Sequence, residues 1–155
     1  MKKLIALALC VLFPLALLAS ESGYVVKYDG GSLTGLSTGT DLRLQIVGNE
    51  IHLMKKHDLV QAIPASAVTE ISYGQDVHRR VGAAIGLAVV SFGLGALMAL
   101  TKSKKHFIGL TWADGDKKGG FAMQCDKNDY RGILTGLEGV TGKTAVDSEA
   151  MTVKN

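Results

Sequence analysis

The stretch RRVGAAIGLAVVSFGLGALMALTKSKKH, Arg79 to His106, decides how the two parts of this chain can fold together. Its twenty central residues, Val81 to Leu100, carry no charge. A helix of that length spans about 30 Å, the thickness of the hydrocarbon core of a bilayer. A buried helix of a soluble domain needs a polar face, which these residues do not supply. The sequence therefore predicts a hydrophobic membrane segment over residues 81–100, either a transmembrane helix or a hairpin that re-enters the membrane.

Half of this segment consists of Gly, Ala and Ser. On an ideal helix one face carries Ala84, Ala88, Ser91, Gly95 and Ala99, and the opposite face carries Gly82 and Gly86. Small residues let membrane helices approach closely, and Gly82-x-x-x-Gly86 is the shortest such motif. We expect these faces to support self-association, although Gly and Ala are also common in membrane helices that do not associate.

Basic residues flank the segment on both sides. They are Arg79, Arg80, Lys102, Lys104 and Lys105. Their excess after the segment favours a cytoplasmic C-terminal part only weakly. Basic residues at both ends also suit a hairpin whose ends contact anionic headgroups.

The N-terminus has the pattern of a secretory signal peptide. Lys2 and Lys3 precede an apolar run that ends before the small residue Ala19. We expect residues 1–19 to be removed on export, with an uncleaved anchor as the alternative. Loss of the two lysines lowers the net charge from +3 to +1, which does not favour nucleic-acid binding. Cys125 is then the single cysteine, so we expect a buried, inert thiol and no internal disulfide.

Short runs of alternating apolar and polar residues lie on both sides of the segment. Such runs, separated by frequent turn signals, are typical of a small antiparallel sheet or barrel. The predicted strands are residues 24–28, 42–46, 51–53, 59–63, 68–73, 106–112 and 120–125. Asp29-Gly30-Gly31 and Gly48-Asn49 are expected to form turns.

A helical period replaces the alternation after residue 125. The apolar side chains at spacings of three and four are Tyr130, Ile133, Leu134, Leu137 and Val140. Asp126 is a candidate cap and Gly142 a candidate stop. The sequence thus predicts a mainly β (α+β) fold, in which an amphipathic C-terminal helix closes a small bent sheet or barrel and one hydrophobic helical segment is inserted. Residues 20–80 and 101–142 would form the domain, and residues 143–155 a partly disordered tail.

This order of elements, together with Ala62-Ile-Pro-Ala-Ser-Ala-Val-Thr-Glu-Ile-Ser-Tyr-Gly74, resembles the bacterial pleckstrin-homology-like family. The resemblance covers roughly residues 24–140. It implies a strongly bent antiparallel sheet of about seven strands, closed at one end by a C-terminal helix. It also implies a binding or scaffolding module, often associated with membranes. Neither a phosphoinositide-type basic cluster nor a catalytic residue carries over from the family.

The sequence has no motif for catalysis or cofactor binding with the required spacing of residues. A phosphate-binding loop needs glycine where Leu137 stands before Gly142-Lys143-Thr144, so we expect no nucleotide binding. The four histidines, His52, His57, His78 and His106, do not have the spacing of metal ligands on a helix, and we expect no metal or other cofactor. The sequence offers no nucleophile, base and orienting group together, so an enzyme is not expected.

These features predict an exported, membrane-associated binding or scaffolding protein of the cell envelope, with the inner membrane favoured. Its expected partners are membrane lipid and either a second copy or another envelope protein. The alternative is a signalling or assembly component with a single span, an exported β domain and a cytoplasmic C-terminal piece. A single span would place residues 20–80 and 101–155 on opposite sides of the membrane.

Overall fold

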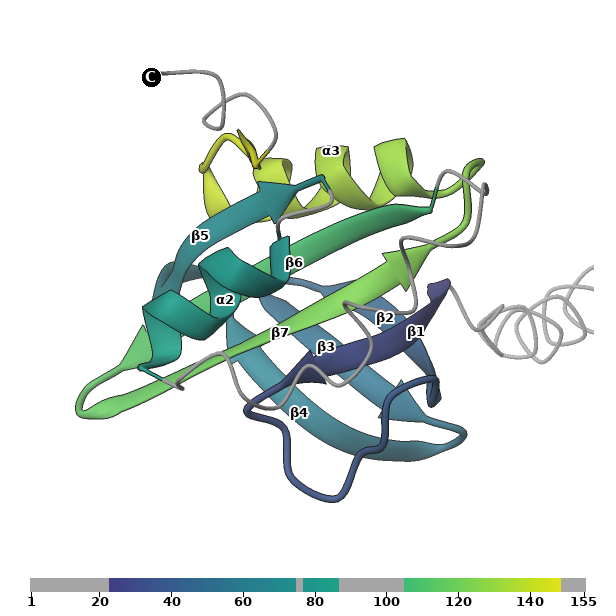
Figure 1. Ribbon diagram of the computed structural model, residues 1–155, viewed down its shortest axis with the longest axis horizontal. Helices are drawn as coiled ribbons and strands as arrows, with labels where there is room; N and C mark the ends of the chain where they lie inside the picture. The colour runs from purple at the N-terminus through teal and green to yellow at the C-terminus, as the bar shows by residue number, and fades with distance from the viewer. Residues whose placement is uncertain (1–22, 75–76, 87–104, 149–155) are drawn as a thin grey trace, which may run out of the picture.

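The computed structural model describes residues 23–74, 77–86 and 105–148, and these form one mainly β domain with two helices (Figure 1). The strands are β1 Tyr24–Gly31, β2 Asp41–Val47, β3 Glu50–Lys55, β4 Asp58–Pro64, β5 Val68–Tyr73, β6 His106–Asp114, β7 Lys117–Cys125 and β8 Val146–Asp147. The helices are α2 Val77–Ile85 and α3 Tyr130–Thr141, and a short 3-10 turn covers Ala65–Ala67. The prediction of a mainly β fold is confirmed.

All eight strands belong to one bent sheet in the order β4-β3-β2-β1-β7-β6-β5-β8. Its neighbours are antiparallel except β5 and β8, and the sheet does not close into a barrel. β1 pairs with β7, with Val26 opposite Cys125, and β5 pairs with β6, with Ile71 opposite Leu110. The parts of the chain before and after the apolar stretch therefore share one sheet.

The strands form where the alternation predicts them, because their inward residues fill a common core. Leu42 and Leu44 of β2 are buried, whereas Asp41, the first residue of the strand, is exposed. The turn at Gly48 is confirmed, with a φ of +59°. The turn predicted at Asp29-Gly30-Gly31 is wrong. These residues continue β1 through a bulge between Tyr28 and Gly30, and the lack of a side chain at Gly31 avoids a clash with Gly120 and Phe121 of β7.

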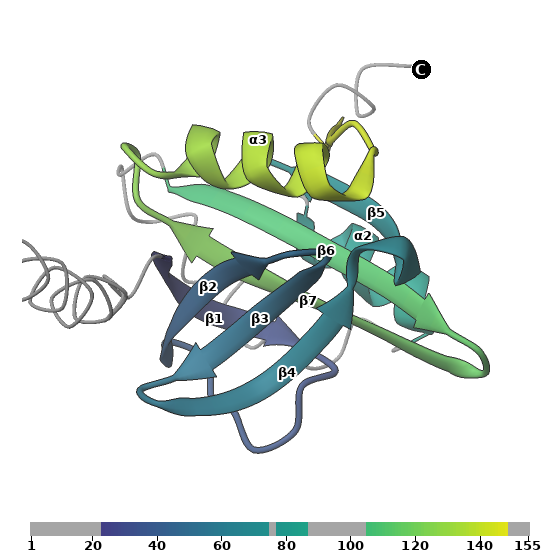
Figure 2. The same ribbon diagram turned by 180° about the vertical axis from the view of Figure 1, so that it is seen from behind.

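The predicted C-terminal helix is confirmed as α3, which packs over the concave side of the sheet (Figure 2). Ile133 and Leu137 are fully buried in the main core, and α3 contacts β2, β5 and β6. The helix ends at Gly142, whose φ is +68° and whose N–H donates to the carbonyl of Glu138. Asp126 stabilises the preceding turn, where its Oδ1 accepts from the Asn128 N–H at 2.8 Å.

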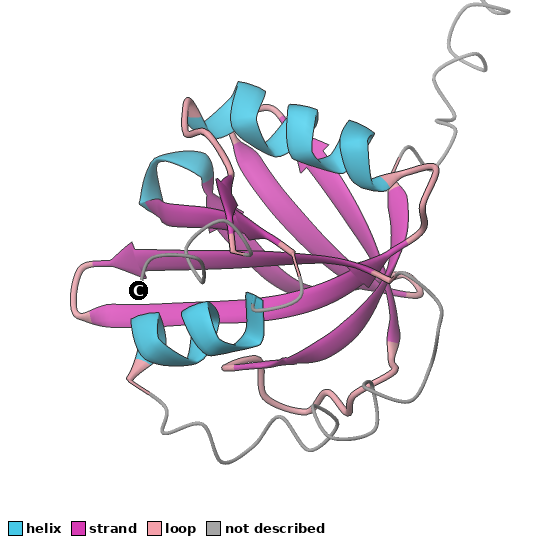
Figure 3. Cartoon of the chain, turned by 45° about the horizontal axis from the view of Figure 1, so that its top comes forward, coloured by secondary structure: helices cyan, strands magenta, loops and turns pink. Residues whose placement is uncertain are grey.

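The second helix, α2, packs against the opposite face of the same strands. Val77 and Val81 form a separate apolar cluster with Phe107 of β6 and Ala122 of β7, and Ile85 packs against it. Successive residues of a strand point to opposite faces, so Phe107 contacts α2 while Ile108 lies in the main core. Figure 3 shows the sheet lying between α2 and α3.

The structure corrects the prediction of a transmembrane helix beginning at Val81. Residues 81–85 complete a nine-residue helix that lies on the sheet and begins at Val77. Within the parts of the chain that the structure describes, no helix has the length and apolar character needed to cross a membrane. The sheet covers Val81 and Gly82, whereas Arg79, Ala83 and Ala84 are exposed, and Gly86, with a φ of +69°, follows the last residue of the helix.

Several predicted features lie outside the described residues. These are the signal peptide over residues 1–19, residues 87–100 of the apolar segment, and residues 149–155 of the tail. The first part of the tail is ordered. Val146 and Asp147 form β8 beside Ser72 and Tyr73, and the Ser148 N–H donates to the Tyr73 carbonyl.

Candidate functional site

The helix α2 carries the first of the residues predicted to pack in a membrane. Gly82 is buried on α2, whereas Ala84 and Gly86 are exposed. Gly82 is thus buried within this domain, and Gly86, which the helical wheel places on the same face, follows the end of α2. The remaining predicted packing residues, Ala88, Ser91, Gly95 and Ala99, lie outside the described residues.

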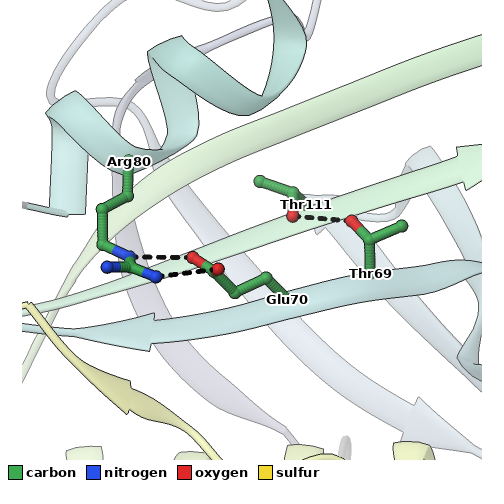
Figure 4. A network of polar contacts seen from close by, with 4 residues as sticks. All are labelled: Thr69, Glu70, Arg80 and Thr111. Carbon is green, nitrogen blue, oxygen red and sulfur yellow. Dashed lines mark hydrogen bonds and ion pairs between the residues drawn. The ribbon is translucent and has the colours of Figure 1, made fainter.

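The predicted flanking basic residues take different positions. Arg80 binds Glu70 of β5 through two parallel hydrogen bonds, Nε to Oε1 and Nη2 to Oε2, both 2.9 Å (Figure 4). This contact raises the pKa of Arg80 and ties α2 to the sheet. Arg79 is exposed, and Lys105 immediately precedes β6. Lys102 and Lys104 lie outside the described residues.

A second polar contact holds the other side of α2. His78 Nε2 lies 2.8 Å from Oδ2 of Asp29, a residue of β1 with only 7% of its side chain exposed. The His78 ring also packs edge-on against Phe107. Since His78 reaches β1 and Arg80 reaches β5, α2 is fastened across the outer face of the sheet at two points.

The other histidines have structural partners. His52 Nε2 lies 2.8 Å from Glu50 Oε2, and the His106 ring stacks on Tyr130 with centroids 3.9 Å apart. His106 Nδ1 is also 2.8 Å from the hydroxyl of Tyr73, so β5, β6 and α3 meet at these rings. The described residues contain no group of His, Cys, Asp or Glu side chains arranged to hold a metal ion. Cys125 is buried, which raises the pKa of its thiol to about 12.

A recess lies between β4 and the β6–β7 hairpin. Its volume is about 490 Å³, within the range of roughly 300–1,000 Å³ typical of ligand sites. Its apolar lining includes Leu33, Val60 and Trp112, and its polar lining includes Gln61, Lys117 and Lys118. Polar atoms make up most of the surface of this recess, and Trp112 is its one aromatic side chain.

Trp112 is held rigidly in this recess. The indole lies so close to Gly119, its partner across the hairpin, that any β-carbon at residue 119 would overlap the ring. Phe121 packs edge-on against it with centroids 6.0 Å apart. Trp112 is partly buried, so the prediction that it fills the core describes only one side of the ring.

Sequence reasoning did not find this recess. Its one local signal is Gly119, which follows the hairpin turn and leaves room for the indole of Trp112. Neither a protein-family model nor a curated protein matches this chain. The candidate site is therefore defined by its own geometry.

Proposed function

We propose that this chain is an exported, non-enzymatic binding or scaffolding module of the cell envelope, associated with a membrane through the apolar stretch that follows α2. The observation that carries the proposal is the pairing of β1 with β7 and of β5 with β6. Because this pairing unites both flanks of the stretch in one domain, the domain can lie on a single face of a membrane. The rigid recess at Trp112 supplies a surface for a partner.

The order of the elements supports a pleckstrin-homology-like domain. Strands β1 to β4 follow one another in the sheet, β5 to β7 form a second antiparallel series, and α3 follows β7. The family resemblance implies this arrangement, with α2 as an addition before β6. Binding is favoured over catalysis because the polar groups of α2, His78 and Arg80, bind Asp29 and Glu70 and so serve to fix the helix.

The alternative function, a component with a single span, requires the two parts of the chain to lie on opposite sides of a membrane. Such a chain could not pair β1 with β7. A reporter enzyme that is active only after export, fused after Asn155, is expected to be active under our proposal. A cytoplasmic C-terminus, detected with a reporter that fluoresces only there, would instead favour the alternative.

Membrane association is tested by replacing residues 87–101 with a Gly/Ser linker of the same length. We expect the wild-type protein in the membrane fraction and the linker variant in the soluble fraction, because burial of apolar side chains drives the association. A variant with the same fifteen residues in scrambled order keeps their hydrophobicity and should remain with the membrane. A linker variant that still sediments with membranes would contradict the proposed tether.

A further inference from the structure

We propose that the recess between β4 and the β6–β7 hairpin binds an extended peptide segment with an acidic end, which adds as a strand to the outer edge of β4. The inference rests on the proposed binding function and names the class of its partner. Three features carry it: the backbone groups at the edge of β4, the fixed indole of Trp112, and the lysines of the hairpin.

The backbone at the edge of β4 is oriented for pairing. β4 ends the sheet, and among the described strands only β3 pairs with it. The Ala65 N–H donates to the Asn49 carbonyl at 2.8 Å, which sets the alternation of hydrogen-bonded pairs along β3 and β4. By this alternation Ala62, opposite His52, directs its N–H and C=O away from β3.

The side chain of Gln61 occupies the hydrogen-bonding position at the Ala62 carbonyl. The Ala62 carbonyl accepts a hydrogen bond from Nε2 of Gln61 at 2.9 Å, and Gln61 also lines the recess. An incoming strand would replace the Gln61 amide as donor to this carbonyl and would accept from the Ala62 N–H. Strand addition of this kind supplies affinity through main-chain hydrogen bonds and specificity through neighbouring side-chain pockets.

The part of β4 around Ala62 is uncharged and regularly paired with β3. No charged residue lies between Leu59 and Ile63, and Leu59 is 52% exposed. Protected edges carry inward charges, prolines or prominent bulges along the strand. β4 has one bulge, at Val60, because Leu53 and Met54 of β3 pair with Gln61 and Leu59, and Pro64 stands at its end. The segment from Gln61 to Pro64 pairs regularly with β3, so this is the part of the edge that an incoming strand can extend.

The opposite wall defines the chemistry of the peptide. Lys117 and Lys118 line the recess with a single carboxylate, Asp116, so this wall is net positive and complements an acidic side chain. Trp112 offers a rigid apolar surface to a neighbouring side chain, and buried aromatic anchors dominate binding at such sites. A lipid headgroup would use the lysines alone, whereas a peptide also uses the directional groups of Ala62.

The test uses the full chain in detergent and the fluorescence of Trp112, the single tryptophan of the protein. The probe is acetyl-Thr-Val-Thr-Val-Glu-Glu-amide, and its control ends in Lys-Lys. We expect a saturable change in emission with the acidic peptide. The double variant K117E/K118E should weaken this binding at least tenfold and favour the lysine peptide, because complementary charges set the preference.

Strand addition is tested separately from charge. Ala62→Pro removes the outward N–H, whereas Ala62→Ser keeps it, so about a tenfold loss is expected for the proline variant alone. Thermal unfolding of both variants checks the fold. A probe with N-methylated valines tests the same hydrogen bonds in the unmodified protein and should bind about tenfold more weakly or not at all.

The proposal is overturned if the N-methylated peptide binds as well as its parent. It is also overturned if detergent micelles that contain phosphatidylglycerol, but not the peptide, change Trp112 emission and K117E/K118E abolishes that change, because the recess would then contact lipid headgroups. Detergent makes this titration independent of the membrane tether. If the peptide does not bind but the linker variant leaves the membrane fraction as expected, the peptide site alone is rejected. If the peptide binds but the linker variant stays with the membrane, the tether alone is rejected.

Discussion

Gly109 of β6 sets how closely α2 approaches the sheet. A β-carbon built at this residue would lie 2.5 Å from Ser72 Oγ and from Val77 Cγ1, and 2.8 Å from Val81 Cγ2. These atoms belong to β5 and to the buried side of α2, both of which are packed. The absence of a side chain at residue 109 is therefore a condition for the second apolar cluster.

Gly109→Ala is expected to destabilise the protein by about 1–3 kcal/mol, because overpacking forces the helix and the sheet apart. Gly139→Ala in α3 is the matched control, since a β-carbon there meets no atom within 4 Å and alanine favours a helix by up to about 1 kcal/mol. Urea unfolding of the two variants measures both effects. Equal stability of the two would show that α2 does not pack as described.

The helix α2 is short, and side chains from the sheet hold it in place. Isolated helices shorter than about 12 residues are marginal in water, so a nine-residue helix depends on its tertiary contacts. One contact is the apolar cluster around Val81, and the others are the polar contact of His78 with Asp29 and the ion pair of Arg80 with Glu70. The Arg80–Glu70 pair is bidentate and only partly exposed, which favours a measurable contribution.

A double-mutant cycle of Arg80→Ala and Glu70→Ala is expected to give a coupling energy of about 0.5–1 kcal/mol. Hydrogen exchange should accelerate in α2 and stay unchanged in α3, since only α2 loses an attachment. The exposed pair Lys27–Asp41 provides a matched cycle, with side chains 51% and 66% exposed, and should give a coupling near zero. Similar coupling in both cycles would mean that the Arg80 pair does not fasten α2.

The domain as a whole depends on strands contributed from both sides of the apolar stretch. β7 and β6 lie between β1 and β5 in the sheet, so neither part of the chain contains a complete set of neighbours. Both parts also contribute to one core, in which Leu44 and Ile51 join Leu110 and Phe121.

Fragments 20–86 and 105–155 should therefore fold only together. Each alone is expected to unfold without cooperativity, and an equimolar mixture should recover the native emission of Trp112 and a cooperative thermal transition. The second fragment contains this tryptophan, so its own emission serves as the reference. Native emission from fragment 105–155 alone would contradict the single-core description.

The amino-acid sequence by itself determined the strands β1 to β7, the turn at Gly48 and the helix α3. Their signals are local: an alternation such as Leu42-Arg43-Leu44 or a stripe such as Ile133 and Leu137 is visible within a few residues.

Only the tertiary structure decided where Val81 to Ile85 lie and where a ligand fits. The outer surface that receives α2 consists of alternate residues of β6 and β7, and the recess joins β4 to a hairpin more than fifty residues away in sequence. Such surfaces exist only after the strands pair. An uncharged run therefore looked the same in sequence whether a membrane or the face of a sheet would cover its first turns.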